Sequence, residues 1–342
     1  MAAPAFSSST TSTWQTETKA TVAAAKPSTT QSLAATPAPT VASVPVRDRD
    51  AGWRRGDAEL GGNYLSDVSF VDVRHGWAVG GWSGVIVATD DGGETWRRQV
   101  SSTQSELTGV SFVDRRYGWA VGFAGTILAT VDGGVTWKPQ ANPGGDYLAV
   151  SFVDRSHGWA VGNCGVISAT TDGGVSWTIQ VAPPAALVCD RTTLTDVAFT
   201  DPKHGWAVGA DVILVTADGG RTWARQSSPR TGLYDAFLLD ARRGWIVGSN
   251  TILSTLDGGV SWTVQDAGLP DVALLGVTFA TPNRGWVVGI ARDGDEHGVI
   301  LGTTDGGRSW VREGAPSTAM LRGVTALGPA NAWAVGTDVL HR

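Results

Sequence analysis

The sequence predicts an all-β fold, a seven-bladed β-propeller of four-stranded antiparallel blades, on three observations. A first phrase ending in Trp-Ala-Val-Gly or a close variant occurs seven times, and a second phrase, T-x-D-G-G-x-[TS]-W, occurs six times between its copies. No apolar stripe of helical period runs longer than two turns in the 342 residues. A period of roughly 20–50 residues is typical of solenoids and propellers. The tryptophans of the first phrase, 39 to 47 residues apart, are Trp77, Trp119, Trp159, Trp206, Trp245, Trp286 and Trp333.

Each repeat reads as four short strands. In the second repeat, LTGVSFVD and YGWAVG alternate apolar and small residues, TILAT follows, and TWKPQ ends the unit after a glycine turn. Alternation of period two with β-branched and aromatic residues is typical of strands, and Gly/Asp clusters supply the turns. Four strands in each period make one propeller blade, whose sheet packs face to face on the next blade.

The two ends of the repeat region predict how the ring closes. Only nine residues follow Trp333, too few for the second phrase and its strand. At the other end, GWRR at 52–55 is similar to TWRR at 95–98, and Trp53 precedes Trp77 by 24 residues, within the 22–29 found elsewhere. We therefore expect the N-terminal strand to complete the C-terminal blade, which removes the open sheet edges of the ring.

Composition excludes several classes of protein. The formal net charge of −6 argues against a general nucleic-acid binder, which needs a basic field. No apolar run approaches the ~18–20 residues of a membrane span. Two cysteines are too few for a cysteine metal cluster or a disulfide-dense small protein. We expect no metal, no cofactor and no nucleic-acid partner, and a monomer.

The first fifty residues form a separate segment by composition. Ala, Ser, Thr and Pro account for 33 of them, against three acidic and four basic residues. Such a segment buries too little apolar surface to offset its chain entropy, so residues 1–50 are predicted to be disordered and 51–342 to form the propeller. The segment has no continuous hydrophobic region of a signal peptide. A plain linker and an organelle transit peptide both remain open.

The second phrase is predicted to be structural. A short carboxylate can accept N–H groups of its own turn, the glycines permit positive φ, and the tryptophan covers the hairpin. Six regularly spaced copies cannot all converge on one catalytic site. The pattern resembles the Asp box, or BNR repeat, of sialidases and of many non-enzymatic propellers. Its aspartates are Asp91, Asp132, Asp172, Asp218, Asp257 and Asp305.

With FVD, GWAVG and DGG-x-TW recurring in almost every unit, about 290 residues resemble the photosystem II assembly and stability factor family of β-propellers. This resemblance implies a non-enzymatic scaffold that binds newly made membrane-protein subunits, including photosystem II subunit precursors, on the lumenal side. It favours an extracytoplasmic location: secreted, in the cell envelope or associated with thylakoids.

Basic residues recur at one place, the turn between the first two strands of each blade. Equivalent hairpins of a propeller emerge on one face, so these residues would form a positive ring that could steer an acidic partner segment. The alternative is that they only solubilise the turns, partly neutralised by neighbouring aspartates. The candidates are Arg74, Arg115, Arg116, Arg155, Lys203, Arg242, Arg243 and Arg284, accompanied by His75, His157 and His204.

The opposite face is expected to carry the turns between second and third strands and the links between blades. Trp82 and Phe123 lie in such turns, either as contact anchors or folded over the blade edge. Cys164 lies in the corresponding turn of the third blade and Cys189 in the link that leaves it. A disulfide between them would indicate an oxidising compartment, and two free thiols are the alternative.

An enzyme is the main alternative in function. Sialidases use an arginine cluster, a Tyr nucleophile with a Glu partner, and an acid/base Asp, but none of the four tyrosines has a distinctive sequence neighbourhood. G-x-S-x-G, H-E-x-x-H and P-loop patterns are absent. A catalytic site usually breaks repeat symmetry at one place, and the sequence shows no such constellation. We therefore predict a non-enzymatic scaffold, with a secreted or cell-surface propeller that binds or hydrolyses glycans as the alternative.

Overall fold

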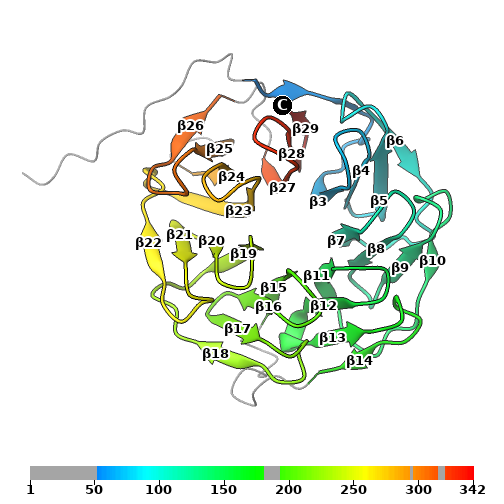
Figure 1. Ribbon diagram of the computed structural model, residues 1–342. Coiled ribbons are helices and arrows are strands. Elements are labelled where there is room, and N and C mark those ends of the chain that lie inside the picture. The colour runs from blue at the N-terminus through cyan, green and yellow to red at the C-terminus, as the bar shows by residue number, and fades with distance from the viewer. Residues whose placement is uncertain (1–51, 181–192, 293–295, 315–319) are drawn as a thin grey trace, which may run out of the picture. The chain divides into compact units, whose positions relative to one another are not determined.

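The computed structural model describes residues 52–180, 193–292, 296–314 and 320–342. Within them, apart from a 3-10 turn at Asn163–Gly165 (η1), every regular element is a β-strand. Seven antiparallel sheets surround a central axis, each as one blade (Figure 1). The predicted fold class and the number of blades are thus confirmed.

Four strands make up each blade, the first lying nearest the axis (Figure 1). Blade 1 consists of β3 (Leu65–Phe70), β4 (Gly76–Gly80), β5 (Val85–Thr89) and β6 (Thr95–Gln99). Blade 2 consists of β7 (Leu107–Phe112), β8 (Gly118–Gly122), β9 (Ile127–Thr130) and β10 (Lys138–Pro139). Blade 3 consists of β11 (Tyr147–Phe152), β12 (Gly158–Gly162), β13 (Ile167–Thr170) and β14 (Thr178–Ile179). Blade 4 consists of β15 (Leu194–Phe199), β16 (Gly205–Gly209), β17 (Val212–Thr216) and β18 (Ala224–Gln226). Blade 5 consists of β19 (Leu233–Leu238), β20 (Gly244–Gly248), β21 (Thr251–Thr255) and β22 (Thr263–Gln265). Blade 6 consists of β23 (Val272–Phe279), β24 (Gly285–Ala291), β25 (His297–Thr303) and β26 (Val311–Glu313).

The seventh blade joins the two ends of the propeller. It consists of β27 (Leu321–Ala326), β28 (Ala332–Gly336), β29 (Val339–His341) and the N-terminal strand β1 (Arg54–Arg55). β1 pairs antiparallel with β29, so the first described strand supplies the outer edge of the last blade, as predicted. The chain then adds β2 (Asp57–Ala58) in parallel to the outer strand β6 of blade 1. The N-terminal segment therefore pairs with blade 7 through β1 and with blade 1 through β2.

Aromatic stacking between blades explains the first phrase. In five of the seven gaps, the indole of the first phrase lies flat against a phenylalanine of the next blade, as with Trp77 on Phe112 at 3.7 Å between ring centroids. The tryptophan of the second phrase then meets that phenylalanine edge-on, as Trp137 does at 5.7 Å. The hydrophobic core is therefore divided among the seven gaps between blades.

The second phrase folds into a self-bonded turn. In blade 2, Asp132 accepts hydrogen bonds from the backbone N–H and hydroxyl of Thr136 and from the hydroxyl of Thr130. Gly133 and Gly134 take φ values of 76° and 87°, which favour glycine. The same bonds recur at the other five copies, so each of the six aspartates is occupied within its own turn.

In five of the seven gaps, a polar contact ties the tryptophan of the outer strand to the blade before it. The indole N–H of Trp137 donates to the side-chain oxygen of Gln99, three residues after the tryptophan of the preceding blade. The same Trp-to-Gln bond recurs at 3.2 to 3.4 Å in three further gaps. Where blade 6 meets blade 7, Glu313 replaces the glutamine and accepts a hydrogen bond of 2.7 Å from Trp53. Trp53 is therefore the seventh tryptophan of this series.

Candidate partner-binding face

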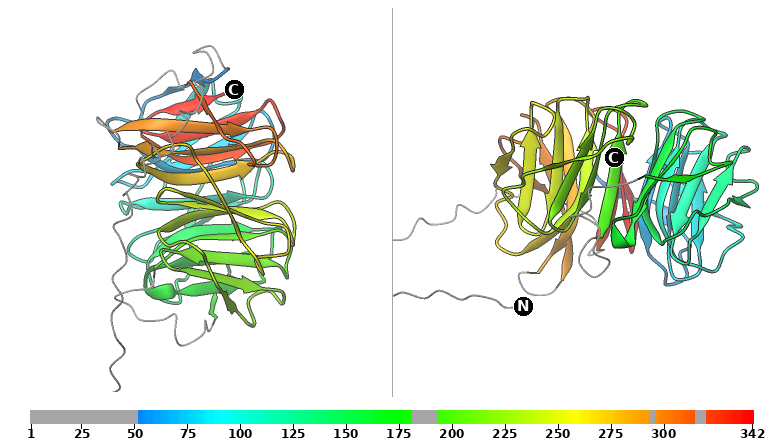
Figure 2. Two further views of the ribbon diagram at one scale, coloured as in Figure 1. Left: turned by 90° about the vertical axis from the view of Figure 1, so that its left-hand side faces the viewer. Right: turned by 90° about the horizontal axis from the view of Figure 1, so that it is seen from below.

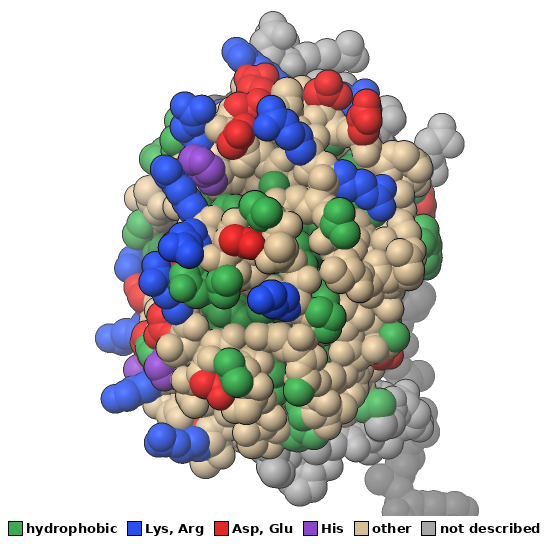
Figure 3. Space-filling model, turned by 90° about the vertical axis from the view of Figure 1, so that its right-hand side faces the viewer, with side chains coloured by type: hydrophobic (Ala, Val, Ile, Leu, Met, Phe, Trp, Pro, Cys, Tyr) green, Lys and Arg blue, Asp and Glu red, His purple; other side chains and the backbone are tan. Residues whose placement is uncertain are grey.

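The strands run between two opposite faces of the propeller (Figure 2). The turns between first and second strands and the Asp-box turns emerge together on one of them, which we call the turn face; the other we call the link face. The backbone N–H of Gly92 in the first Asp box donates to the carbonyl of Arg74, and equivalent bonds recur in blades 2 to 6. Lys, Arg and His side chains gather along one edge of the molecule in a side view (Figure 3).

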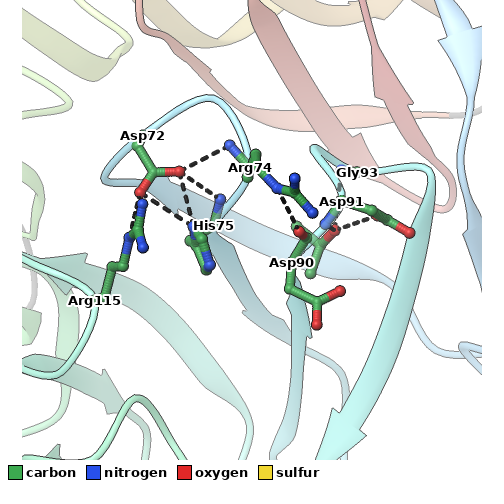
Figure 4. Close-up of polar contacts among 8 residues, drawn as sticks. Asp72, Arg74, His75, Asp90, Asp91, Gly93 and Arg115 are labelled. Atoms are coloured by element: carbon green, nitrogen blue, oxygen red, sulfur yellow. Dashed lines mark hydrogen bonds and ion pairs between the residues drawn. The ribbon is translucent and has the colours of Figure 1, made fainter.

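Ion pairs on the turn face run from one blade to the next. Arg115 of blade 2 donates to the carboxylate of Asp72 in blade 1 at 2.7 Å (Figure 4), and Arg155 of blade 3 makes a 2.7 Å ion pair with Asp114 of blade 2. Both arginine side chains remain more than 60% exposed. Exposed pairs of this kind contribute at most about 1 kcal/mol to stability. Because both side chains are mostly exposed, their guanidinium groups stay accessible to a partner.

Arg243 pairs with Asp240 of its own turn at 2.6 Å, and four other basic side chains of the turn face lie in two environments. Arg74 and Arg116 each donate to a backbone carbonyl beside the adjacent Asp box, at 3.1 and 3.3 Å, and both are exposed. Lys203 and Arg242 are exposed, and their backbone N–H groups donate to aspartates of their own turns. These four residues add positive charge to the turn face without a carboxylate bound to their side chains in the described contacts.

Arg284 differs from the other members of the predicted ring. Its guanidinium turns inward to Glu313 at 3.0 Å, and only 15% of its side chain is exposed. Arg342 approaches the same carboxylate at 2.7 Å, and the indoles of Trp53 and Trp286 donate to it. Arg284 is therefore part of the closure between blades 6 and 7 rather than of the exposed turn face.

Three histidines belong to the same turns. The Nδ1 atoms of His75, His157 and His204 lie 2.8 to 2.9 Å from the carboxylates of the aspartates three residues earlier, Asp72, Asp154 and Asp201. Burial disfavours ionisation of these aspartates, but the hydrogen bonds from the histidine side chains and from backbone N–H groups outweigh it and lower their pKa. The carboxylates are therefore charged at neutral pH.

A second polar cluster lines the central channel and was missed by the sequence reasoning. The inner strands surround a cavity of about 300 Å³, and Asp67, Asp196 and Asp235 line it from blades 1, 4 and 5. Each accepts a hydrogen bond from a backbone N–H of the next blade at 2.7 to 3.0 Å. The available signal was a departure from the repeat, because the equivalent positions of the other blades hold Gly or Ala.

The channel carboxyl groups hold their protons unusually strongly. Burial raises the pKa of Asp67 to about 7, although N–H groups of Val110 and Val68 favour its charged form. Burial also raises the pKa of Asp196 and of Asp235, and in Asp235 the neighbouring charge of Asp196 adds to the effect. Asp67 therefore titrates near neutral pH, whereas the Asp-box carboxylates do not.

We expect the melting temperature of the protein to fall as pH rises from about 5 to about 8. An unfolded aspartate loses its proton near pH 4. Between that pH and about 7 the folded protein binds more protons through Asp67 than the unfolded chain does, so stability is lost as pH rises.

Thermal unfolding of Asp67→Asn should show a smaller difference in melting temperature between the two pH values. Asp72→Asn is the control, because the pKa of Asp72 is lowered and its contribution changes only in acid. An undiminished difference in Asp67→Asn would contradict this assignment.

The link face carries a separate aromatic group. Trp82 is 73% exposed, and its ring meets that of Tyr64 edge-on at 5.7 Å, while Phe123 is half-buried. The Tyr64 hydroxyl donates to Glu106 at 2.5 Å, and Arg322 lies 4.6 Å over the Tyr64 ring. Trp82 is thus available for contact and does not fold over the blade edge.

The Tyr64–Glu106 pair bears on the enzyme alternative. A Tyr nucleophile with a Glu partner is one part of a sialidase site, and the sequence reasoning found no such pair. Burial and the hydrogen bond to Glu106 raise the pKa of Tyr64 to about 12, so the phenol stays protonated. One arginine, Arg322, accompanies the pair, where a sialidase uses a cluster to hold the substrate carboxylate.

Two further predictions concern residues at the edge of what the structure describes. Cys164 lies in the β12–β13 turn with a φ of 59°, but Cys189 lies outside the described residues, so the disulfide stays a prediction. The proposed leader, residues 1–50, also lies outside them.

Among the described residues no group of three or more His, Cys, Asp or Glu is arranged to hold a metal ion, and no helix has the length and apolarity to cross a membrane.

Comparisons with known proteins bear on the family. The family described as photosynthesis system II assembly factor YCF48 matches residues 99–178, 186–233 and 229–337. A structure described as YCF48 bound to D1 peptide has a TM-score of 0.69 at 21% identity, covering 89% of this chain and 98% of that one. The structure of YCF48 from Cyanidioschyzon merolae has a TM-score of 0.69 at 21% identity and covers 85% of this chain and 98% of its own. The structure of the GH74 enzyme of Niastella koreensis has a TM-score of 0.66 at 14% identity, and the match covers 81% of this chain and 52% of the enzyme.

None of the curated proteins matches this sequence. The structural likenesses lie below 25% identity and show the propeller fold alone. The family match is different, because it covers more than half of the chain and includes the Gly-Trp and Asp-box phrases of blades 2 to 6. On this evidence, the chain belongs to the YCF48 family of photosystem II assembly factors.

Proposed function

We propose that this protein is a non-enzymatic scaffold whose turn face binds an acidic, extended segment of a protein partner, of the class of photosystem II subunit precursors. The observation that carries the proposal is the arrangement of exposed cations on equivalent turns of successive blades. Arg74, Arg115, Arg116 and Arg155 lie on blades 1 to 3, and blades 4 and 5 add Lys203 and Arg242. The related YCF48 structure that contains a D1 peptide supports a peptide as the partner.

The charge pattern favours an acidic segment over a neutral one. The chain as a whole is acidic, so a local positive surface opposes the net charge of −6. Clustered charge of one sign attracts a segment of the opposite sign and raises its association rate more than its final affinity. Aspartates in the equivalent turns of the preceding blades hold Arg115 and Arg155 in place, which lowers the entropy lost when a partner binds.

The double charge reversal Arg115→Glu/Arg116→Glu tests this proposal. We expect affinity for a D1 peptide to fall at least about 10-fold at low salt, because two attractive charges become repulsive. The melting temperature should change little, since both side chains are exposed and only one surface ion pair is lost. Fluorescence anisotropy of a labelled peptide and a thermal melt give the two readouts.

A matched control is available on the outer strand of blade 1. Arg97→Glu/Arg98→Glu makes the same change in net charge away from the turns between first and second strands. Peptide affinity should be close to that of the wild type in this variant. Equal affinity for the wild type and the Arg115→Glu/Arg116→Glu protein would remove the turn face from consideration.

Two further features belong to the same proposal. We infer a monomer, because one chain closes the ring and leaves no blade incomplete, and analytical ultracentrifugation tests it. We infer an extracytoplasmic location from the family resemblance, and fractionation of the source cells tests that. Glycan binding or hydrolysis remains the alternative, and no contact in the Tyr64–Glu106 group favours it over a structural role.

A further inference from the structure

One position of the turn face holds histidine in three blades and arginine in two. It is the residue just before the Gly-Trp pair or its variant, and in blade 5 it is Arg243. The Arg243 guanidinium donates to Asp240, three residues earlier, through Nε at 2.7 Å. In blade order, the seven residues at this position are His75, Tyr117, His157, His204, Arg243, Arg284 and Asn331.

The histidines make the contact that Arg243 makes with a permanent charge. Each Nδ1 meets the carboxylate three residues earlier, and the side chains are 25%, 37% and 41% exposed, so protons can exchange with solvent. Histidine is the side chain that ordinarily changes charge between pH 5 and 8. Blades 1, 3 and 4 therefore carry a titratable version of a fixed cation.

We propose that protonation of His75, His157 and His204 regulates the turn face, so that it binds an acidic segment more tightly as pH falls from 7.5 to 5.5. This inference rests on the proposed function, since it concerns the same face and partner. Three added positive charges at these positions would accompany the exposed cations of blades 1 to 5. Because they stand on equivalent turns, one extended acidic segment could contact more than one of them.

Charged groups of both signs surround the histidines. A cavity of about 510 Å³ between blades 3 and 4 is lined by His157, Lys203 and Arg221, so protonation adds to charge already present there. Asp218 also lines this cavity, but its oxygens accept hydrogen bonds from Thr216 and Thr222 of its own turn. The remaining charged neighbours in these turns are Asp72, Arg74 and Arg115 for His75, Asp154 and Arg155 for His157, and Asp201 and Lys203 for His204.

The test is binding of a labelled octa-aspartate peptide to the full chain at pH 7.5 and pH 5.5, at constant low salt. The label blocks the amino terminus, and aspartate side chains stay ionised at both pH values, so the charge of the probe stays nearly constant. We expect wild-type affinity to be about 10-fold higher at pH 5.5, since each new surface contact contributes modestly. The triple variant H75Q/H157Q/H204Q should lose most of this difference, to less than about twofold.

Two controls separate this effect from other titrating groups. The triple variant H75R/H157R/H204R copies the arginine of blade 5 and should bind at pH 7.5 about as tightly as the wild type does at pH 5.5. His297→Gln changes a histidine of the β24–β25 hairpin, on the link face, and should keep the wild-type pH dependence. The channel aspartates are unchanged in all three proteins, and circular dichroism at both pH values checks that they stay folded.

The outcomes are distinguishable. Equal affinity of the wild type at the two pH values, or an undiminished difference in H75Q/H157Q/H204Q, would overturn the regulatory role while the proposed binding face stands. Failure of the wild type to bind octa-aspartate at either pH would count against the proposed function itself, and this inference would fall with it.

Discussion

Replacing Glu313 with alanine is expected to lower the free energy of unfolding by about 3–5 kcal/mol. The carboxylate is 8% exposed and accepts bonds from Arg284, Arg342 and the indoles of Trp53 and Trp286. Its removal leaves two guanidinium groups, themselves 15% and 21% exposed, without their shared counter-charge. Urea or thermal unfolding of the two proteins measures the effect.

Glu313→Gln is the informative companion variant. Gln99, Gln140, Gln180 and Gln265 already accept the indole N–H of the following blade, so the amide should keep the bond from Trp53. It cannot neutralise the arginines, and we expect a smaller loss than in the alanine variant. A Glu313→Ala protein as stable as the wild type would show that the arginines find other partners and that this cluster does not secure the closure.

Replacing Trp53 with alanine is expected to cost about 3–5 kcal/mol as well, because a large buried side chain leaves a cavity. Trp53 is 6% exposed and meets Trp286 edge-on at 6.5 Å between ring centroids. Its loss removes the indole that joins β1 to blade 6, so the outer edge of blade 7 should open. Hydrogen exchange should then rise in β29, which pairs with β1, more than in blades 2 to 4.

Trp82→Ala is the matched control for the loss of an indole. Trp82 is 73% exposed, and its replacement should change the free energy of unfolding by less than about 0.5 kcal/mol. Uniform faster exchange in all blades of Trp53→Ala would contradict a local opening. Because Trp53 and Glu313 are in contact, the double variant should lose less than the sum of the two single losses.

The blades and their order could be predicted from the sequence because the information is local and repeated. Alternating apolar residues, a glycine turn and an Asp box recur within each period, so every blade confirms the assignment of the others. The closing strand was predictable for the same reason, since Trp53 lies at the usual spacing from Trp77. The position of the basic turns on one face followed from the hairpin topology alone.

The individual contacts of those basic residues could not be predicted in this way. Arg115 and Arg284 occupy similar turns, yet one bridges to the preceding blade on the surface and the other turns inward to Glu313. Arg284 stands directly before its Gly-Trp pair, whereas Arg115 lies three residues before Gly118. The inward cluster also needs Gly302, because a Cβ there would lie 2.3 Å from the Glu313 carboxylate oxygen, and the equivalent position of blade 2 holds Ala129. Such space is visible only when the strands are assembled.

By itself, then, the sequence determined the class of fold, the number of blades, the joint between the two ends and the chemistry of the turns, all of which depend on neighbours within one period. Tertiary structure alone decided the channel aspartates, the ion pairs between blades and the buried carboxylate at the closure. Trp53 and Glu313 are 260 residues apart, and Asp67 bonds to a strand 43 residues away. Contacts across such distances set burial and charge, and these determine which polar residues are structural and which remain available to a partner.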